Sequence, residues 1–279
     1  MKMTGWKRTL FIIACLTPSM LLSLGIVIYP IINTVILSFR DPESGAFSLT
    51  NYVFLFTNKL PRASIWYTLW VTILTVLLAI LIAYLIALYL RFSDSKISHF
   101  IGTIYLLPRF IPALVAVYAM MNIVKDAGLI NRLTGVKPGI LYNWKGILLM
   151  NLWFNIPFAS MIIVAALSNI STSIIESARD VGAGRLRIFF QMILPLSIKD
   201  VLIATTFVFM SNISSFTTPY LIGPNFPSML GVYLRSQFSN RKYEIAAATS
   251  VVIFLLSAVS AIVYLYSNMK ERAWENGDG

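Results

Sequence analysis

The sequence has a single cysteine, Cys15, and a single histidine, His99. One cysteine excludes an internal disulfide and a thiolate metal cluster, and these two residues are too few for the usual zinc, haem or Cys–His nucleophile sites. No Gly-x4-Gly-Lys-Ser/Thr phosphate loop occurs, so the chain carries no ATP-hydrolysis motif of its own. Charged residues make up only 12% of the chain, against about 25% in soluble domains. The sequence therefore disfavours a metal-binding protein, a cofactor-dependent enzyme and a soluble globular domain.

Hydrophobic residues are abundant instead, at 58% of the chain. A helix needs about 20 predominantly apolar residues to cross a bilayer. We predict six such helices, at approximately Thr9–Phe39, Ile65–Leu90, Phe100–Val124, Ile147–Leu167, Val201–Ile222 and Ile245–Ser267. The net charge of +11 comes from small basic groups between these stretches, which is typical of membrane-segment ends rather than of a nucleic-acid-binding face. The prediction is an all-α integral membrane protein with one transmembrane domain over residues 1–279.

The first apolar stretch sets the expected orientation. It is too long for the hydrophobic part of a signal peptide and no small-residue cleavage site follows, so we expect an uncleaved span, broken or kinked at Pro18 and Pro30. Lys2, Lys7 and Arg8 precede it without an acid, and the positive-inside rule then favours a cytoplasmic N-terminus. Six spans place both termini in the cytoplasm, together with the loop between the fourth and fifth spans.

That loop, residues 171–196, is the one long inner loop and is unusually charged. Ser173 and Glu176 have capping-box spacing, which predicts the start of a helix. Gly182-Ala183-Gly184 should interrupt this helix, because glycine reaches backbone conformations that side chains forbid. We expect a second short helix next, with the following span beginning at Pro195. The predicted helix–turn–helix projects from the membrane face and is shaped for insertion into another protein.

The loop resembles a motif of the permease subunits of binding-protein-dependent ABC importers. In that family the motif is Glu-Ala-Ala, three residues, Gly, nine residues, Ile, one residue, Leu-Pro. The matching positions here, at the same spacing, are Glu176, Ala178, Gly182, Leu194 and Pro195. Ser177 replaces the second motif residue and Met192 replaces the isoleucine, so both departures keep the small or apolar character.

The resemblance implies that the loop is a coupling helix, which docks into a cleft of a separate ATP-hydrolysing subunit and transmits its closure to the spans. The implied docking residues are Glu176, Ser177, Ala178, Asp180, Gly182, Arg185, Leu194 and Pro195. The implied partners are a second permease subunit, identical or homologous, two ATP-binding subunits and an extracytoplasmic solute-binding protein. ATP and Mg are expected on the ATPase, with no cofactor in this chain, and the location is the bacterial cytoplasmic membrane. The alternative is a capped loop helix in which Glu176 only caps.

The ionisable residues in the apolar stretches distinguish between other possible membrane functions. An ion-coupled secondary transporter normally needs an ionisable group within the membrane, and the six stretches contain no Asp or Glu away from their ends. A membrane-embedded enzyme needs clustered acids, histidines or a Ser–His pair, which are missing. Arg109 does lie within a stretch, between Pro108 and Pro112. It either faces a translocation cavity or, as the sequence favours, snorkels to headgroups or caps carbonyls freed by a proline kink.

The fifth stretch ends in "FMSNISSFTTPYLIG", which is too polar for a lipid-facing strip. These groups either line a wet cavity, which we favour, or hydrogen-bond neighbouring helices. The pathway candidates are Asn155, Asn212, Ser215 and Thr218, with Asn212 and Ser215 expected on one helix face.

The same segment suggests a solute. "FTTPYLIG" resembles the polyamine-type branch of the family, which implies a spermidine- or putrescine-like or related organic solute. Sugar or glycerol-phosphate import is the alternative. A polyamine is ordinarily held by carboxylates, and the apolar stretches offer none. The cavity is then expected to be a low-affinity passage, with selectivity in the binding protein.

Overall fold

The computed structural model describes residues 5–275, and Lys2, on which the orientation partly rests, lies outside them. Helices dominate the described residues, which also hold one isolated β-bridge between Arg40 and Phe47. The helices that are long and apolar enough to cross a membrane are Thr9–Ser38, Lys59–Phe92, Ala113–Thr134, Trp144–Ser168, Arg185–Ile213 and Tyr243–Ile262. The predicted all-α chain with six candidate spans is confirmed.

The chain divides into two units, of which the first comprises residues 1–59 and 234–252. Its N-terminal helices are α1 (Gly5–Leu22), a π-helical turn (Ser23–Ile28), α2 (Tyr29–Ser38) and α3 (Thr50–Thr57). The helical path from α1 to α2 is continuous and Pro18 lies inside α1, so the chain is broken at neither Pro18 nor Pro30, and a π turn precedes Pro30. Pro30 explains its position, because a proline ring clashes with the carbonyl four residues earlier. The Tyr29 N–H donates to the Leu24 carbonyl, five residues back, which accommodates the ring.

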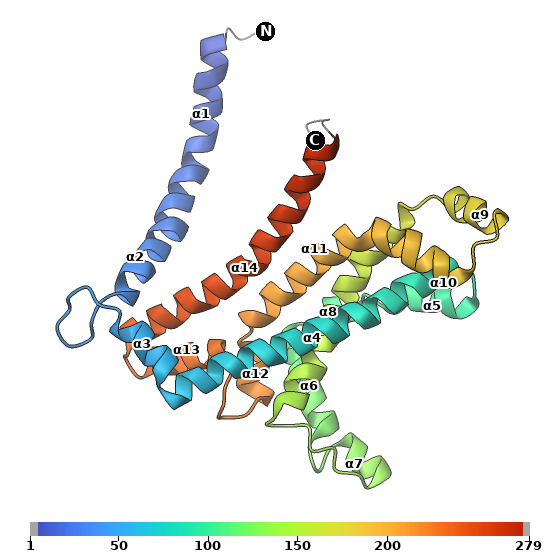
Figure 1. Cartoon of the computed structure of the whole chain (residues 1–279). Helices are drawn as coiled ribbons and strands as arrows, with labels where there is room; N and C mark the ends of the chain where they lie inside the picture. The colour runs from blue at the N-terminus through green and yellow to red at the C-terminus, as the bar shows by residue number, and fades with distance from the viewer. Residues whose placement is uncertain (1–4, 276–279) are drawn as a thin grey trace. The chain divides into compact units, whose positions relative to one another are not determined.

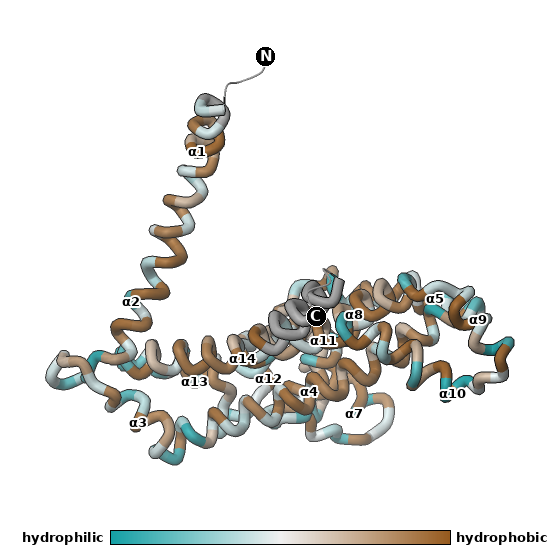
Figure 2. Tube along the Cα trace, turned by 45° about the horizontal axis from the view of Figure 1, so that its top comes forward, coloured by the Kyte–Doolittle hydropathy of each residue, from teal (hydrophilic) through white to brown (hydrophobic). Residues whose placement is uncertain are grey.

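The second unit comprises residues 60–233 and 253–279. Its helices are α4 (Lys59–Phe92), α5 (Lys96–Ile104), a 3-10 turn (Leu107–Phe110), α6 (Ala113–Val124), α7 (Leu129–Thr134), α8 (Trp144–Ser168), α9 (Thr172–Asp180), α10 (Arg185–Ile188), a π turn (Phe189–Ile193), α11 (Leu194–Ile213) and α12 (Thr217–Ile222). Two helices run across the division between the units: α13 (Leu230–Ser239) and α14 (Tyr243–Glu275). Figure 2 shows the long helices as largely apolar, with hydrophilic residues more frequent around α9 and α10.

The main core of the second unit lies where α4, α8 and α11 pack together (Figure 1). Ala79, Ala83 and Ala87 recur every four residues on α4 and are fully buried, and such small side chains allow helices in a membrane to approach closely. A buried hydrogen bond of 2.8 Å joins the hydroxyls of Tyr84 and Ser197, and so ties α4 to α11. These three helices form the support on which the loop between α8 and α11 rests.

Two predicted spans are wrong as continuous helices. The third, Phe100–Val124, is interrupted between α5 and α6, where Pro108 and Pro112 each lack a backbone donor and Pro112 serves as the N-cap of α6. Arg109 therefore lies in a break rather than within a span. The fifth, Val201–Ile222, stops at Ile213 and resumes as α12, because Pro219 cannot donate to the Ser215 carbonyl and its ring would clash there.

Candidate functional site

The loop between α8 and α11 begins with α9, whose start differs from the predicted one. Its N-cap is Ser171, and no side-chain capping bond forms there. Ser173 lies inside the first turn, and its hydroxyl is 2.6 Å from that of Ser171. The predicted capping box of Ser173 and Glu176 is therefore wrong, because the helix begins earlier than the box requires. Glu176 is exposed on α9 and free of the capping role that the sequence suggested.

The helix α9 ends at Asp180 and a turn follows at Gly182, so the predicted interruption is present. Gly182 has φ of +82°, in the left-handed region that favours glycine. Its N–H donates to the Arg179 carbonyl at 2.8 Å, and the Ala183 N–H donates to the Ala178 carbonyl at 3.0 Å. This pair of bonds is the Schellman motif, which satisfies the last carbonyls of a helix. The chain then enters α10 in a defined direction.

The tip of the loop is apolar and uncovered. Val181 is 84% exposed and Leu186 is 76% exposed, on either side of the glycine turn. Neither residue belongs to the predicted docking set. Both are neighbours of its members in the sequence, since Val181 precedes Gly182 and Leu186 follows Arg185. Of that set, Ala178 and Leu194 are half-buried, and the exposed members are Glu176, Ser177, Asp180, Gly182, Arg185 and Pro195. The loop thus presents mostly exposed motif residues around an apolar tip.

The base of the loop is fixed to the helical core. Ile175 of α9 and Ile188 of α10 are both buried in the cluster formed by α4, α8 and α11. Arg91, near the end of α4, donates to the carbonyls of Leu167 and Ile170, both at 3.1 Å, and to the Thr172 hydroxyl at 3.2 Å. A force on the loop would therefore reach α4 and α8 directly.

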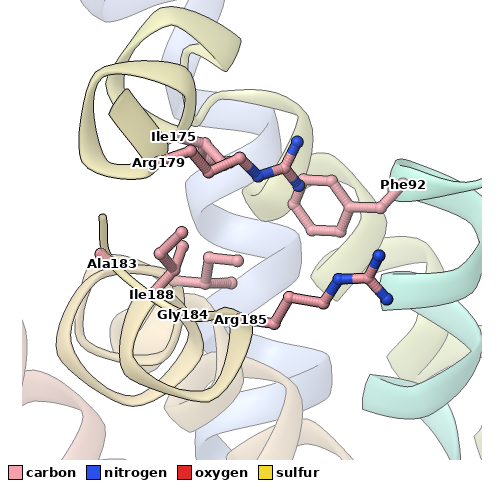
Figure 3. Close-up of a pocket in the computed structure, with 8 residues that line it drawn as sticks. Phe92, Ile175, Arg179, Ala183, Gly184, Arg185 and Ile188 are labelled. Carbon is pink, nitrogen blue, oxygen red and sulfur yellow. The ribbon is translucent and has the colours of Figure 1, made fainter. Parts of the chain in front are cut away.

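A hollow of about 610 Å³ lies between α9, α10 and the end of α4. Figure 3 shows the side chains of Arg179 and Arg185 extending toward the same side, where the Phe92 ring lies. Ile175 and Ile188, which are both buried, also line the hollow. The hollow combines an apolar floor with two positive charges, which suits an acidic and apolar element of a partner protein.

A second cavity, of about 390 Å³, lies among the helices of the second unit. It contains all the predicted pathway residues, namely Asn155, Asn212, Ser215 and Thr218, together with Thr217. Ser215 lies beyond the end of α11, so it shares the cavity with Asn212 but not one helix face. Ser214 is not among the lining residues, and its hydroxyl donates to the Met210 carbonyl.

Polar side chains at this cavity also join α8 to α11. The Asn155 amide nitrogen lies 3.5 Å from the Asn212 amide oxygen, and the Ser211 hydroxyl donates to the Asn155 amide oxygen at 3.1 Å. The Asn212 amide donates to the Val208 carbonyl at 2.6 Å. The sequence analysis offered two alternatives for these polar residues, a cavity lining or hydrogen bonds to neighbouring helices. Asn155, Ser211 and Asn212 do both, since they line a cavity and form hydrogen bonds between α8 and α11.

Arg109 and Asn151 also line the cavity, and neither is among the predicted pathway residues, although a position facing a cavity was the less favoured alternative for Arg109. The guanidinium carbon of Arg109 lies 4.9 Å from the centroid of the Phe158 ring, and both residues line the cavity. Asn151 is only 3% exposed, and its amide nitrogen has no hydrogen-bond partner. Its position four residues before Asn155 on α8 is a signal that could have identified it, since such residues share a helix face.

Comparison with known proteins places these features in a family. Residues 79–272 match the family described as binding-protein-dependent transport system inner membrane component. The spermidine/putrescine transport system permease protein PotB of Escherichia coli (strain K12) is 21% identical over 181 residues, covering 61% of this chain and 66% of the relative. The sulfoquinovosyl glycerol transport system permease protein SmoG of Agrobacterium fabrum (strain C58) is 31% identical over 130 residues, covering 44% of this chain and 42% of the relative.

A solved structure has a similar fold. It is a bacterial alginate ABC transporter in complex with an alginate pentasaccharide-bound periplasmic protein. The match has a TM-score of 0.76 at 19% identity and covers 95% of each chain. At this identity the likeness establishes the fold of the chain and leaves its solute open.

Proposed function

Because the chain belongs to the binding-protein-dependent transport system inner membrane components, we propose that it forms half of the membrane pathway of an ATP-driven importer. The observation that carries this proposal is the loop 171–196, in which the motif residues form a helix, a left-handed glycine turn and a second helix with an uncovered apolar tip. The family membership also argues against the ion-coupled transporter considered from the sequence.

The proposal assigns each step to a subunit. A second permease subunit, identical or homologous, completes the pathway, and two ATP-binding subunits receive the loops and hold ATP and Mg. An extracytoplasmic binding protein delivers the solute, an arrangement supported by the alginate transporter solved with its periplasmic protein. The loop and both chain termini face the cytoplasm in this assignment. Closure of an ATPase cleft on the loop then moves α4 and α8 through the contacts of Arg91, Ile175 and Ile188.

This division of labour predicts the behaviour of the isolated chain. Vesicles that contain only this chain should hydrolyse no ATP and accumulate no solute, because the sequence has no phosphate loop. Reconstitution with the second permease, the ATP-binding subunits and the binding protein should restore both activities. ATP turnover by the purified chain alone, measured as phosphate release, would contradict the proposal.

Different observations support two solute classes. The relatives named as PotB support the spermidine- or putrescine-like solute expected from the sequence. The cavity supports the alternative, a sugar or glycerol-phosphate-type solute. Its lining offers hydroxyls and amides from Asn155, Ser211, Asn212 and Thr218, while none of the described residues that line it is acidic. Hydroxyls and amides suit a hydroxylated solute, whereas a polyamine would find no carboxylate. We therefore favour the second class.

A deletion strain distinguishes the two classes. Without this chain, cells should lose uptake of a labelled sugar or glycerol phosphate and should keep putrescine uptake. Re-expression of the wild-type chain is the control and should restore what was lost. Loss of putrescine uptake with retained sugar and glycerol-phosphate uptake would instead support the polyamine-type function.

A further inference from the structure

The cavity has one charged side chain among its lining residues, that of Arg109. In the described part of the chain, no carboxylate pairs with this guanidinium, and its observed side-chain contact is with the face of the Phe158 ring. Stacking on a ring leaves the N–H groups at the guanidinium edge available, and guanidinium matches the geometry of carboxylate, sulfate and phosphate oxygens. Arginine keeps its charge at every physiological pH. The site therefore carries a fixed positive charge that no described acid neutralises.

Asn151 is the second observation and is independent of the first. Its side chain is almost fully buried, yet its amide nitrogen lacks a partner. Asn155, one helical turn later, shows the usual arrangement, because its amide nitrogen donates to the Asn151 carbonyl at 2.7 Å. Buried polar groups in proteins nearly always have a hydrogen-bond partner. Among the described residues, the other buried side-chain atoms without partners are on Tyr67, Thr72 and Ser160, none of which lines this cavity.

We infer that this cavity holds an anionic group of the transported solute, a carboxylate, sulfate or phosphate, through the Arg109 guanidinium and the Asn151 amide. The inference rests on the proposed function, since it takes the cavity as part of the pathway. An anion accepts from both groups and supplies the partner that Asn151 lacks. A polyamine would instead meet a like charge at Arg109. The hydroxyls of Ser215, Thr217 and Thr218, which also line the cavity, suit the uncharged part of such a solute.

The test uses the complete importer in nanodiscs and two pairs of probes that differ in charge. These are glycerol 3-phosphate against glycerol, and glucuronate against glucose. For the wild type we expect each acid to bind at least about tenfold more tightly than its uncharged partner, the effect of one charge-assisted hydrogen bond. Equal affinities within both pairs, or no binding of either acid at millimolar concentration, would overturn the inference.

Variants identify the residues responsible. Arg109→Gln and Asn151→Asp should each remove the preference for the acids, the second because it replaces a donor with a negative charge at nearly constant shape. Arg109→Lys should retain part of the preference. Arg132→Gln, on exposed α7 and outside the cavity, is the matched control and should change nothing. An unchanged preference in both Arg109→Gln and Asn151→Asp would contradict the assignment.

Two additional measurements separate the possible failures. If the wild-type chain does not co-purify with an ATPase, the proposed function itself fails. If the ATPase is present but the acids show no preference, the anion site fails alone. A lipid phosphate is the other source of the same chemistry. Phosphatidylglycerol retained by the wild type and lost from Arg109→Gln, without acid binding, would assign the cavity to a lipid headgroup and overturn a solute site.

Discussion

Substitution of Gly182 by aspartate is expected to abolish solute uptake while the protein still accumulates in the membrane. Gly182 has φ of +82°, a conformation that costs an ordinary residue about 1–2 kcal/mol. Apart from Gly182 and its two chain neighbours, a Cβ added there would meet no atom within 4 Å, so it would point into the space where we place the ATPase cleft. The carboxylate would add a charge beside the apolar tip of Val181 and Leu186. Uptake, ATPase co-purification and membrane abundance are the measurements.

Three further variants show which physical effect is responsible. Gly182→Asn adds a side chain of similar size, but asparagine tolerates the left-handed region, so continued loss of uptake would indicate blocked docking. Gly184→Ala is the matched control, because Gly184 has φ of −71° and equally open surroundings, and it should be tolerated. Ser177→Ala, which moves toward the family motif, should also change little. If Gly182→Asp keeps full uptake and its ATPase, the loop is not a docking element.

The helices that could be predicted from the sequence are those with long, uninterrupted apolar stretches. The helices Lys59–Phe92 and Trp144–Ser168 contain the predicted second and fourth spans, because burial in hydrocarbon requires only sufficient apolar length. The third and fifth spans were predicted as single helices because hydropathy scores only side chains. It does not take into account whether a residue has a backbone N–H to donate. The missing N–H groups of Pro108, Pro112 and Pro219 ended those helices early.

The candidate site was predictable where a local rule determines it. Spacing was enough to identify Gly182, since a glycine that follows a short helix and precedes another is typical of a left-handed turn. The start of α9 was predicted at the wrong serine because serine is a favoured N-cap residue, and the sequence alone does not distinguish Ser171 from Ser173. Asn151 was missed because the absence of a partner for its amide depends on residues that are far away in the sequence. The position of Arg109 at the cavity depends in turn on the break between α5 and α6. Such long-range placement leaves no periodic signal in a single sequence.

Arg91 carries no family motif, yet the structure gives it the second-largest expected effect. It approaches the carboxyl end of α8, where the last carbonyls lack helical partners and the helix dipole favours a cation. Its guanidinium bonds the Leu167 carbonyl in the last turn of α8, the Ile170 carbonyl just beyond that helix, and the Thr172 hydroxyl at the start of α9. The Leu167 carbonyl also accepts from the Ile170 N–H at 3.2 Å, so the loss of Arg91 falls mainly on the Ile170 carbonyl, and an unpaired acceptor in a partly buried site costs about 1–3 kcal/mol. Removing Arg91 should therefore loosen the base of the docking loop while its tip at Gly182 stays intact.

The expected result for Arg91→Leu is an importer that still binds its ATPase but moves several-fold less solute for each ATP hydrolysed. Arg91→Lys should recover only part of this coupling, because an ammonium group cannot reproduce the fork that reaches several acceptors. Lys96→Gln removes a neighbouring exposed cation at the start of α5 and should leave coupling unchanged. Transport and ATP turnover are measured on the same vesicles, with amide hydrogen exchange over residues 167–182 reporting the loosened base. An unchanged ratio of solute to ATP in Arg91→Leu, or an equal loss in Lys96→Gln, would show that force does not pass from the loop to α4 and α8 through this arginine.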